Sequence, residues 1–133
     1  MTQDEEGTLL ELPKGLLGFP GLTKYRLLEP PDAYPLKFLQ SEEQPDLSFV
    51  VMDVASVKSD YVVPLPEEDA RQLALEREED ALVLTLVVVP KDPRRMTTNL
   101  AGPLVINART RVGRQIVLSG DQFPLQYPIL GER

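Results

Sequence analysis

The fold is decided at residues 97–118, TTNLAGPLVINARTRVGRQIVL, which predict a β-hairpin. Apolar and polar residues alternate over Leu104–Arg109 and again over Gln115–Ser119, with the period of two that half-exposed strands show. The residues between them, Thr110–Gly113, supply the turn. Pro103 has no N–H to donate, so the first strand starts there or turns its N–H side to an edge. We therefore start from a β-rich chain.

The same alternation predicts which side chains of the hairpin are covered. Leu104 and Ile106 are expected to share the covered face with the apolar residues of the returning strand, Ile116 and Leu118. This assignment depends on the pairing register, because a slip of one residue exchanges the two faces.

Polar side chains gather on the opposite face and at the tip of the hairpin. Asn107 and Gln115 are expected to point outward, close enough across the pair to bond each other or an incoming backbone. Arg109, Arg111 and Arg114 crowd the turn and could hold a phosphate or carboxylate group. With 21 acidic residues in the chain, pairing with acidic neighbours or exposure to solvent is the favoured interpretation.

Further strands are predicted at regular intervals along the chain, separated by turn residues. They favour a mainly β fold, a small antiparallel β-barrel-like single domain with one or two short helices. The segments are Thr8–Leu12, Gly15–Phe19, Tyr25–Leu28, Leu36–Gln40, Ser48–Asp53 and Ala81–Val89. We expect one domain over residues 1–133, with flexible ends at 1–6 and 131–133.

Two local signals refine this outline. The residues Phe19–Leu22 place proline and glycine at the two corners of a predicted type II turn. Pro66–Arg77 predicts a helix, because proline suits its first position and the acidic Glu67, Glu68 and Asp69 suit the positive end of its dipole. Its apolar stripe is narrow, so the helix is expected on the surface of the sheet or at one end of a barrel.

Composition excludes several classes of chemistry. The 133 residues include no histidine, cysteine or tryptophan, so there is no Ser-His-Asp or Cys-His system, no thiolate or imidazole zinc site and no disulfide. The acidic runs are neighbours in sequence rather than carboxylates set across a cleft, and none has the spacing of a calcium loop. We expect no enzyme activity, no cofactor and no metal.

Charge is unevenly distributed along the chain. The net charge is −7; residues 1–90 hold 7 basic and 18 acidic side chains, whereas residues 91–133 hold 7 basic and 3 acidic ones. This balance argues against direct nucleic-acid binding, which requires neutralisation of phosphates. It favours a basic protein partner, although an acidic surface that only keeps the protein soluble is the simpler alternative.

The start of the chain, MTQDEEG, is unlike the basic and then apolar start of a signal peptide. The longest apolar stretch, Ala81–Val89, is about half of what a membrane helix needs. A cytoplasmic protein without membrane contact is expected.

The loop before the hairpin carries small hydrogen-bonding residues, Thr97, Thr98 and Asn99, next to Leu100. They could contact a partner. They could equally hold a turn through bonds to their own backbone.

Taken together, these motifs resemble the FliW family of bacterial flagellar assembly factors over nearly the whole chain. The most specific pieces are the Thr98–Leu100 triplet, the strand Pro103–Asn107 and the Gly113–Gln115 return. The remaining pieces are Gly15–Leu22, Leu39–Ser41, Phe49–Asp53, Asp60–Tyr61, Phe123 and the tail around Pro128.

The resemblance implies a monomeric protein that exchanges two partners in the cytoplasm. It would bind newly made flagellin, and when flagellin is exported it would capture the translational regulator CsrA and lift repression of flagellin synthesis. On this basis we expect partner contacts at Thr98, Asn99, Leu100, Asn107, Gln115 and Val117, and at the acidic Glu67, Glu68 and Asp69. A small-ligand-binding β-barrel without catalytic activity remains the alternative.

Overall fold

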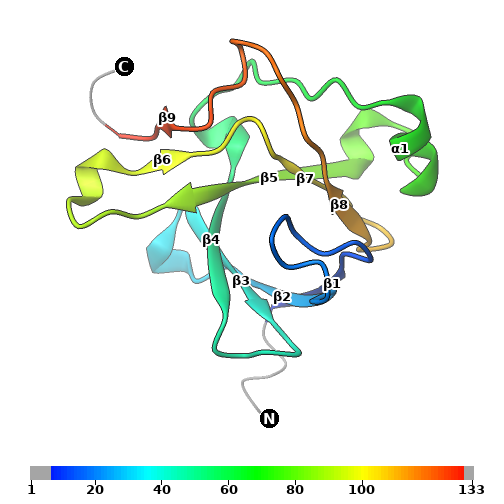
Figure 1. Ribbon diagram of the computed structural model, residues 1–133, viewed down its shortest axis with the longest axis horizontal. Coiled ribbons are helices and arrows are strands. Elements are labelled where there is room, and N and C mark those ends of the chain that lie inside the picture. Colours follow the sequence, from blue (N-terminus) through cyan, green and yellow to red (C-terminus); the bar gives the residue numbers. More distant parts are fainter. Residues whose placement is uncertain (1–6, 131–133) are drawn as a thin grey trace.

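The described part of the chain, residues 7–130 of a computed structural model, forms a curled antiparallel sheet with one short α-helix on its outside (Figure 1). The expected flexible ends, 1–6 and 131–133, lie outside the described residues. The strands are β1 (Thr8–Glu11), β2 (Lys24–Leu28), β3 (Leu36–Ser41), β4 (Ser48–Asp53), β5 (Ala81–Val88), β6 (Thr97–Thr98), β7 (Leu104–Asn107), β8 (Gly113–Gln115) and β9 (Tyr127–Pro128). The helix α1 spans Glu67–Gln72, and the 3-10 turns are η2 (Pro31–Ala33), η3 (Val54–Ser56), η4 (Glu78–Asp80) and η5 (Pro93–Arg95).

The long strand β5 organises the sheet. Strands β1 to β5 pair in chain order, and β5 then pairs with two partners on its other edge, β7 along its first half and β6 near its end. At the far side of the curl, the Glu11 N–H donates to the Arg111 carbonyl oxygen at 2.9 Å, beside a single parallel bridge between Glu11 and Val112. The sheet is therefore barrel-like but only loosely closed, and the mainly β prediction is confirmed.

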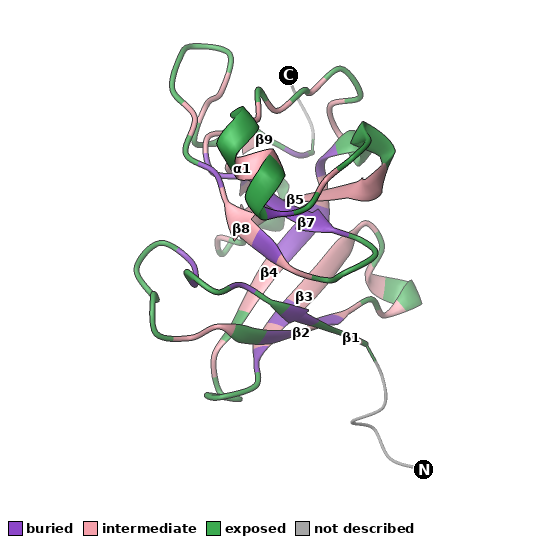
Figure 2. Ribbon diagram, turned by 90° about the vertical axis from the view of Figure 1, so that its right-hand side faces the viewer, coloured by how far each residue is buried: buried purple, intermediate pink, exposed green. Residues whose placement is uncertain are grey.

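Three apolar clusters hold the sheet. The largest fills the inside of the curl and consists of Leu10, Leu12, Leu16, Tyr25, Leu27, Leu39, Val51, Leu84, Leu104 and Ile106. A second, around Met52 and Ile129, packs under β9, and a third, around Leu73, Val105 and Ile116, lies beneath α1. Figure 2 shows the buried β7 lying between α1 and the rest of the sheet.

Most predicted strands are present to within one residue, but the returning strand of the hairpin is Gly113–Gln115 and not Gln115–Ser119, and Gly15–Phe19 is not a strand. Leu12 and Leu16 carbonyl oxygens accept from the Gly15 and Phe19 N–H groups at 2.7 Å, and Gly15 and Gly18 have φ of 67° and 88°. Two glycines in left-handed conformations fold this segment into tight turns.

The turn at Phe19–Leu22 forms, with the Leu22 N–H donating to the Phe19 carbonyl oxygen at 3.3 Å. It is not the predicted type II turn, however, because Gly21 is absent from the positive-φ glycines that such a turn requires.

The helix α1 ends earlier than the predicted helix Pro66–Arg77. Pro66 is the residue before the first turn, and the helix stops at Gln72 because Ala74 adopts a φ of 56° and reverses the chain. No helix within residues 7–130 is long and apolar enough to cross a membrane.

The predicted face assignment of the hairpin is wrong by one residue. Leu104 pairs with Gln115 and Ile106 with Gly113. Ile116 therefore shares its face with Val105, in the cluster beneath α1, and not with Leu104 and Ile106 inside the curl.

Candidate docking surface

Asn107 does not point outward, and this corrects the sequence prediction. Its side chain is fully buried, and its Nδ2 donates to the carbonyl oxygens of Leu73 at 2.8 Å and Ala74 at 3.2 Å. Its Oδ1 accepts from the N–H groups of Arg109 and Thr110 at 2.9 and 3.2 Å. The amide thus ties the end of α1 to the hairpin turn, and it is unavailable for direct contact with a partner.

The Gln115 side chain does not bond Asn107. It links β8 to the loop at Leu17 and to the loop at Gly102 through hydrogen bonds. Its Oε1 accepts from the Leu17 N–H at 2.9 Å and its Nε2 donates to the Gly102 carbonyl oxygen at 2.9 Å. A Cβ at position 102 would lie 2.9 Å from that Nε2, so glycine leaves room for the amide. Leu17 itself is 66% exposed, so Gln115 holds an apolar side chain at the surface.

The Thr98–Leu100 triplet is mostly structural. Thr98 is buried in β6, with its hydroxyl oxygen 2.6 Å from that of Thr85 and 2.9 Å from the Leu86 carbonyl oxygen. Leu100 is also fully buried. Asn99 is partly buried and accepts from the Ala101 N–H at 2.8 Å, as the turn interpretation expected. Thr98 and Leu100 therefore shape the loop from inside.

Among the other expected contact residues, Val117 is 70% exposed. Glu67 and Glu68 are exposed on α1, and Glu68 accepts from Arg71 at 2.9 Å. Asp69 is mostly covered and forms an ion pair of 2.7 Å with Arg114, which joins α1 to β8.

Of the three arginines at the hairpin tip, one pairs with an acidic neighbour and two are exposed to solvent. Arg114 pairs with Asp69, and Arg109 and Arg111 are exposed and form no ion pair within residues 7–130.

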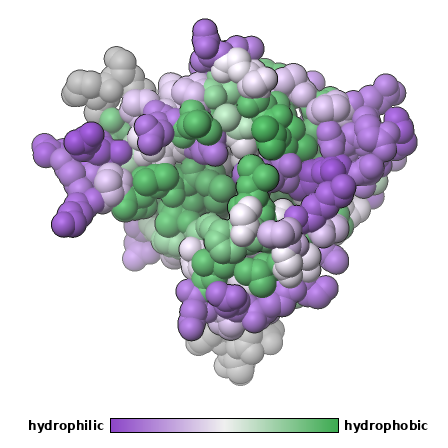
Figure 3. All heavy atoms as spheres, viewed as in Figure 1, coloured by the Kyte–Doolittle hydropathy of each residue, from purple (hydrophilic) through white to green (hydrophobic). Residues whose placement is uncertain are grey.

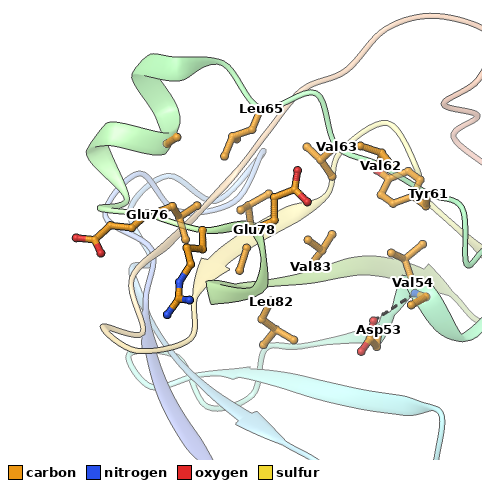
Figure 4. A pocket seen from close by; sticks show the side chains of 16 residues that line it. Asp53, Val54, Tyr61, Val62, Val63, Leu65, Glu76, Glu78, Leu82 and Val83 are labelled. Carbon is orange, nitrogen blue, oxygen red and sulfur yellow. Dashed lines mark hydrogen bonds between the residues drawn. The ribbon is translucent and has the colours of Figure 1, made fainter.

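A groove runs beside α1 on the outer face of β5 (Figure 4). It measures about 630 Å³ and is bounded by four segments: residues 53–55 at the end of β4, residues 61–65, residues 70–83 from α1 into β5, and Val105 of β7. Its apolar lining is Val54, Val62, Val63, Leu65, Leu75, Leu82, Val83 and Val105. We call it the α1 groove.

The far wall of the α1 groove is anchored by Tyr61. Its hydroxyl donates to the Leu100 carbonyl oxygen at 2.7 Å, and its ring meets that of Phe123 edge-on at 6.2 Å between centroids. Burial raises the pKa of Tyr61 to about 12, so the hydroxyl stays protonated and donating at neutral pH.

The near wall follows from the end of α1. The positive φ of Ala74 turns the chain back, so that Leu75 lines the groove and its N–H donates to the Ala70 carbonyl oxygen at 2.9 Å. The chain then passes through η4 into β5, whose Val83 forms part of the floor.

Charge surrounds the apolar lining. The rim carries the carboxylates of Asp53, Glu76 and Glu78. The rim cation, Arg77, lies 3.8 Å from Glu79. The Asp53 side chain also accepts from the Ala55 N–H at 3.2 Å, which fixes the turn η3 (dashed in Figure 4). The groove therefore suits apolar side chains flanked by positive charge.

Apolar side chains also reach the surface on the face seen in Figure 1. Figure 3 shows them across the middle of that face, over β4, β5 and the loop between β1 and β2. Val88 and Val89 at the end of β5 and Leu17 in the loop are all at least half exposed. Within residues 7–130, no group of three or more acidic side chains is placed to hold a metal ion.

Sequence reasoning did not identify the α1 groove. Its walls come from a stretch without regular structure, Val62–Leu65, and from the residues just after the helix. The signal was present as an apolar, proline-interrupted run, VVPLP, directly before the acidic start of α1. Without the fold, nothing placed this run opposite β5.

Comparison with known proteins identifies the family and agrees with the fold. The family model described as FliW protein matches residues 1–129. The flagellar assembly factor FliW of Geobacter sulfurreducens is 35% identical over 96% of this chain and 80% of its own length. That of Natranaerobius thermophilus is 37% identical over 96% and 85%. A crystal structure of the flagellar assembly factor FliW superposes with a TM-score of 0.87 at 25% identity, covering 100% of this chain and 91% of that one. The chain therefore belongs to the FliW family of flagellar assembly factors.

Proposed function

We propose that this protein acts as a monomer in the cytoplasm by binding two protein partners in turn, newly made flagellin and the regulator CsrA, without catalysing a reaction. The observation that carries the proposal is the α1 groove, an apolar groove with a volume of about 630 Å³ and acidic residues at its edge, in a member of the FliW family.

The chemistry of the two partners suits such a surface. CsrA binds RNA and so presents basic surface, which an acidic protein with a net charge of −7 would attract. Flagellin carries amphipathic terminal segments that are uncovered before assembly, and an apolar groove can receive a segment of that kind. Flagellin that occupies the protein would leave CsrA free to repress translation, and export of flagellin would reverse this.

The small-ligand-binding alternative has less support. It requires a cavity lined by converging polar groups. Within residues 7–130 the inside of the curled sheet is filled by the apolar cluster around Leu39, Val51 and Leu84.

Calorimetric titration of the purified protein with flagellin and, separately, with CsrA tests the proposal. Saturable binding of one partner per protein molecule is expected in both titrations. Absence of heat with both partners, repeated at a second temperature, would contradict it.

A further inference from the structure

Residues 61–66, which we call the bare strand, are extended like a strand but pair with no strand in the described part of the chain. From Tyr61 to Pro66 the odd-numbered residues are partly buried and the even-numbered ones are exposed. This alternation is the period of two that a strand on a surface shows. In Figure 4 the side chains of Val63 and Leu65 extend into the α1 groove.

Within residues 7–130, the backbone of the bare strand is unpaired between its two ends, where the Tyr61 N–H donates to the Lys58 carbonyl oxygen at 3.1 Å and the Pro66 carbonyl oxygen accepts from the Ala70 N–H at 3.0 Å. Within residues 7–130, no hydrogen bond engages the N–H groups of Val62, Val63 and Leu65 or the carbonyl oxygens from Val62 to Leu65. Backbone donors and acceptors in folded proteins are nearly always paired with protein or water. A fixed row of them is a ready template for another strand.

The prolines do not block such pairing. Successive residues of an extended chain direct their N–H groups to opposite edges, so Pro64 and Pro66 remove donors from one edge only. Val63 and Leu65 keep their donors on the other edge. The protein already contains a pair this short, because β9 joins β6 through two residues, one of which is Pro128.

The bare strand is also held in place. At one end Tyr61 donates to Leu100 and packs on Phe123; at the other, Pro66 begins α1. A segment fixed in the binding conformation loses little entropy when a partner pairs with it.

Charge identifies the partner more closely. The groove beside the bare strand accepts apolar side chains, and its rim holds Asp53, Glu76 and Glu78. Lysine or arginine residues that flank an apolar segment would complement these carboxylates.

We propose that the bare strand binds an extended segment of a protein partner by strand pairing. Alternate apolar side chains of that segment lie in the α1 groove, and its flanking lysines or arginines face the acidic rim. The inference rests on the proposed function in one respect, that the partner is a protein.

Amide hydrogen exchange of the whole protein tests this inference. The probe is a short synthetic peptide with valine at alternate positions and lysine at both ends. Two matched control peptides carry N-methyl groups on backbone nitrogens. One is methylated on the edge of the peptide that would pair with the bare strand, and the other on the opposite edge. We expect saturable binding, slowing of exchange at the Val63 and Leu65 amides by about tenfold or more, and loss of binding when the pairing edge is methylated. Binding without slower exchange, equal binding of both methylated peptides, or no binding would overturn the inference.

A charge test accompanies it. Glu76→Lys with Glu78→Lys should weaken peptide binding by about tenfold. The control pair, Asp32→Lys with Asp46→Lys, makes the same charge change at exposed positions outside the groove and should leave binding nearly unchanged. Equal weakening of peptide binding by both pairs of substitutions would overturn the placement of the peptide's lysines at the acidic rim, because net charge alone would then explain the effect.

Failure of this inference is distinguishable from failure of the proposed function. If flagellin or CsrA binds while exchange at Val63 and Leu65 stays fast, the bare strand is not their site and the proposed function stands. If neither binds but the peptide does, the proposed function fails and strand pairing stands.

Discussion

The side-chain amide of Asn107 donates to the carbonyl oxygen of Leu73 at 2.8 Å, across 34 residues of sequence. Leu73 is the residue that caps the C-terminal end of α1, directly after Gln72. A carbonyl at a helix end has no partner within the helix, and here a strand residue supplies the partner. The junction fixes α1, and with it the near wall of the α1 groove, to the hairpin.

Asn107→Ala should destabilise the protein by about 2–3 kcal/mol, because it leaves buried backbone groups on both sides of the junction without partners. Chemical denaturation measures the change. Asn99→Ala is the control, since Asn99 is partly buried and accepts one local bond; its cost should stay below about 1 kcal/mol. Equal costs for the two variants would refute the structural role of Asn107.

Tyr61→Phe should change how stability depends on pH. Burial raises the pKa of Tyr61 to about 12, whereas the unfolded residue titrates near 10. Between these values the unfolded chain releases a proton that the folded chain retains, so the free energy of unfolding falls as pH rises from 10 to 12. The variant should lack this part of the fall. Denaturation curves at pH 8, 10 and 11 would show it, and parallel losses in both proteins would contradict it.

At neutral pH, Tyr25→Phe should stabilise the protein, whereas Tyr61→Phe should destabilise it. The Tyr25 hydroxyl is fully buried and has no hydrogen-bond partner within residues 7–130. Its removal relieves an unpaired polar group, so the free energy of unfolding should rise by about 1 kcal/mol, while Tyr61→Phe, which removes a paired hydroxyl, should lower it by a similar amount. Thermal denaturation compares the two variants. Destabilisation by Tyr25→Phe would indicate that the hydroxyl has a partner.

Reversing the charge of α1 tests the role assigned to its exposed carboxylates. Glu67→Lys with Glu68→Lys should slow association with CsrA by about tenfold at low salt and flatten its dependence on salt. Stopped-flow or surface-based kinetics measure the on-rate, with the Asp32→Lys and Asp46→Lys pair as the control. An on-rate unchanged from the wild type would remove α1 from the interface.

The sequence predicted the strands better than their surroundings. The apolar run from Phe49 to Met52 lies within the predicted strand Ser48–Asp53, and its Val51 and Met52 belong to clusters on opposite sides of the sheet. Such runs are local. The end of α1 is not, because it depends on a left-handed Ala74, which tertiary contacts with Asn107 stabilise against its intrinsic preference.

The expected contact residues show the same limit. Alternation alone cannot fix pairing register, and the one-residue difference in the hairpin placed Gln115 on the face of Leu104. Asn107 lies on the opposite face, as predicted, but α1 covers that face, so the Asn107 side chain reaches Leu73 instead of solvent. The predicted strand Gly15–Phe19 was also wrong for a reason that apolar pattern alone does not reveal. Gly15 and Gly18 lie in an apolar stretch that resembles a strand, yet their positive φ values fold it into turns.

Partner exchange is the central claim, and displacement tests it most directly. The protein is first saturated with CsrA, and flagellin is then titrated into the complex in a calorimeter while free CsrA is followed by its binding to RNA. We predict that flagellin releases CsrA with an apparent affinity lowered by the CsrA already bound. Flagellin that binds the complex with undiminished affinity and releases no CsrA would contradict the account.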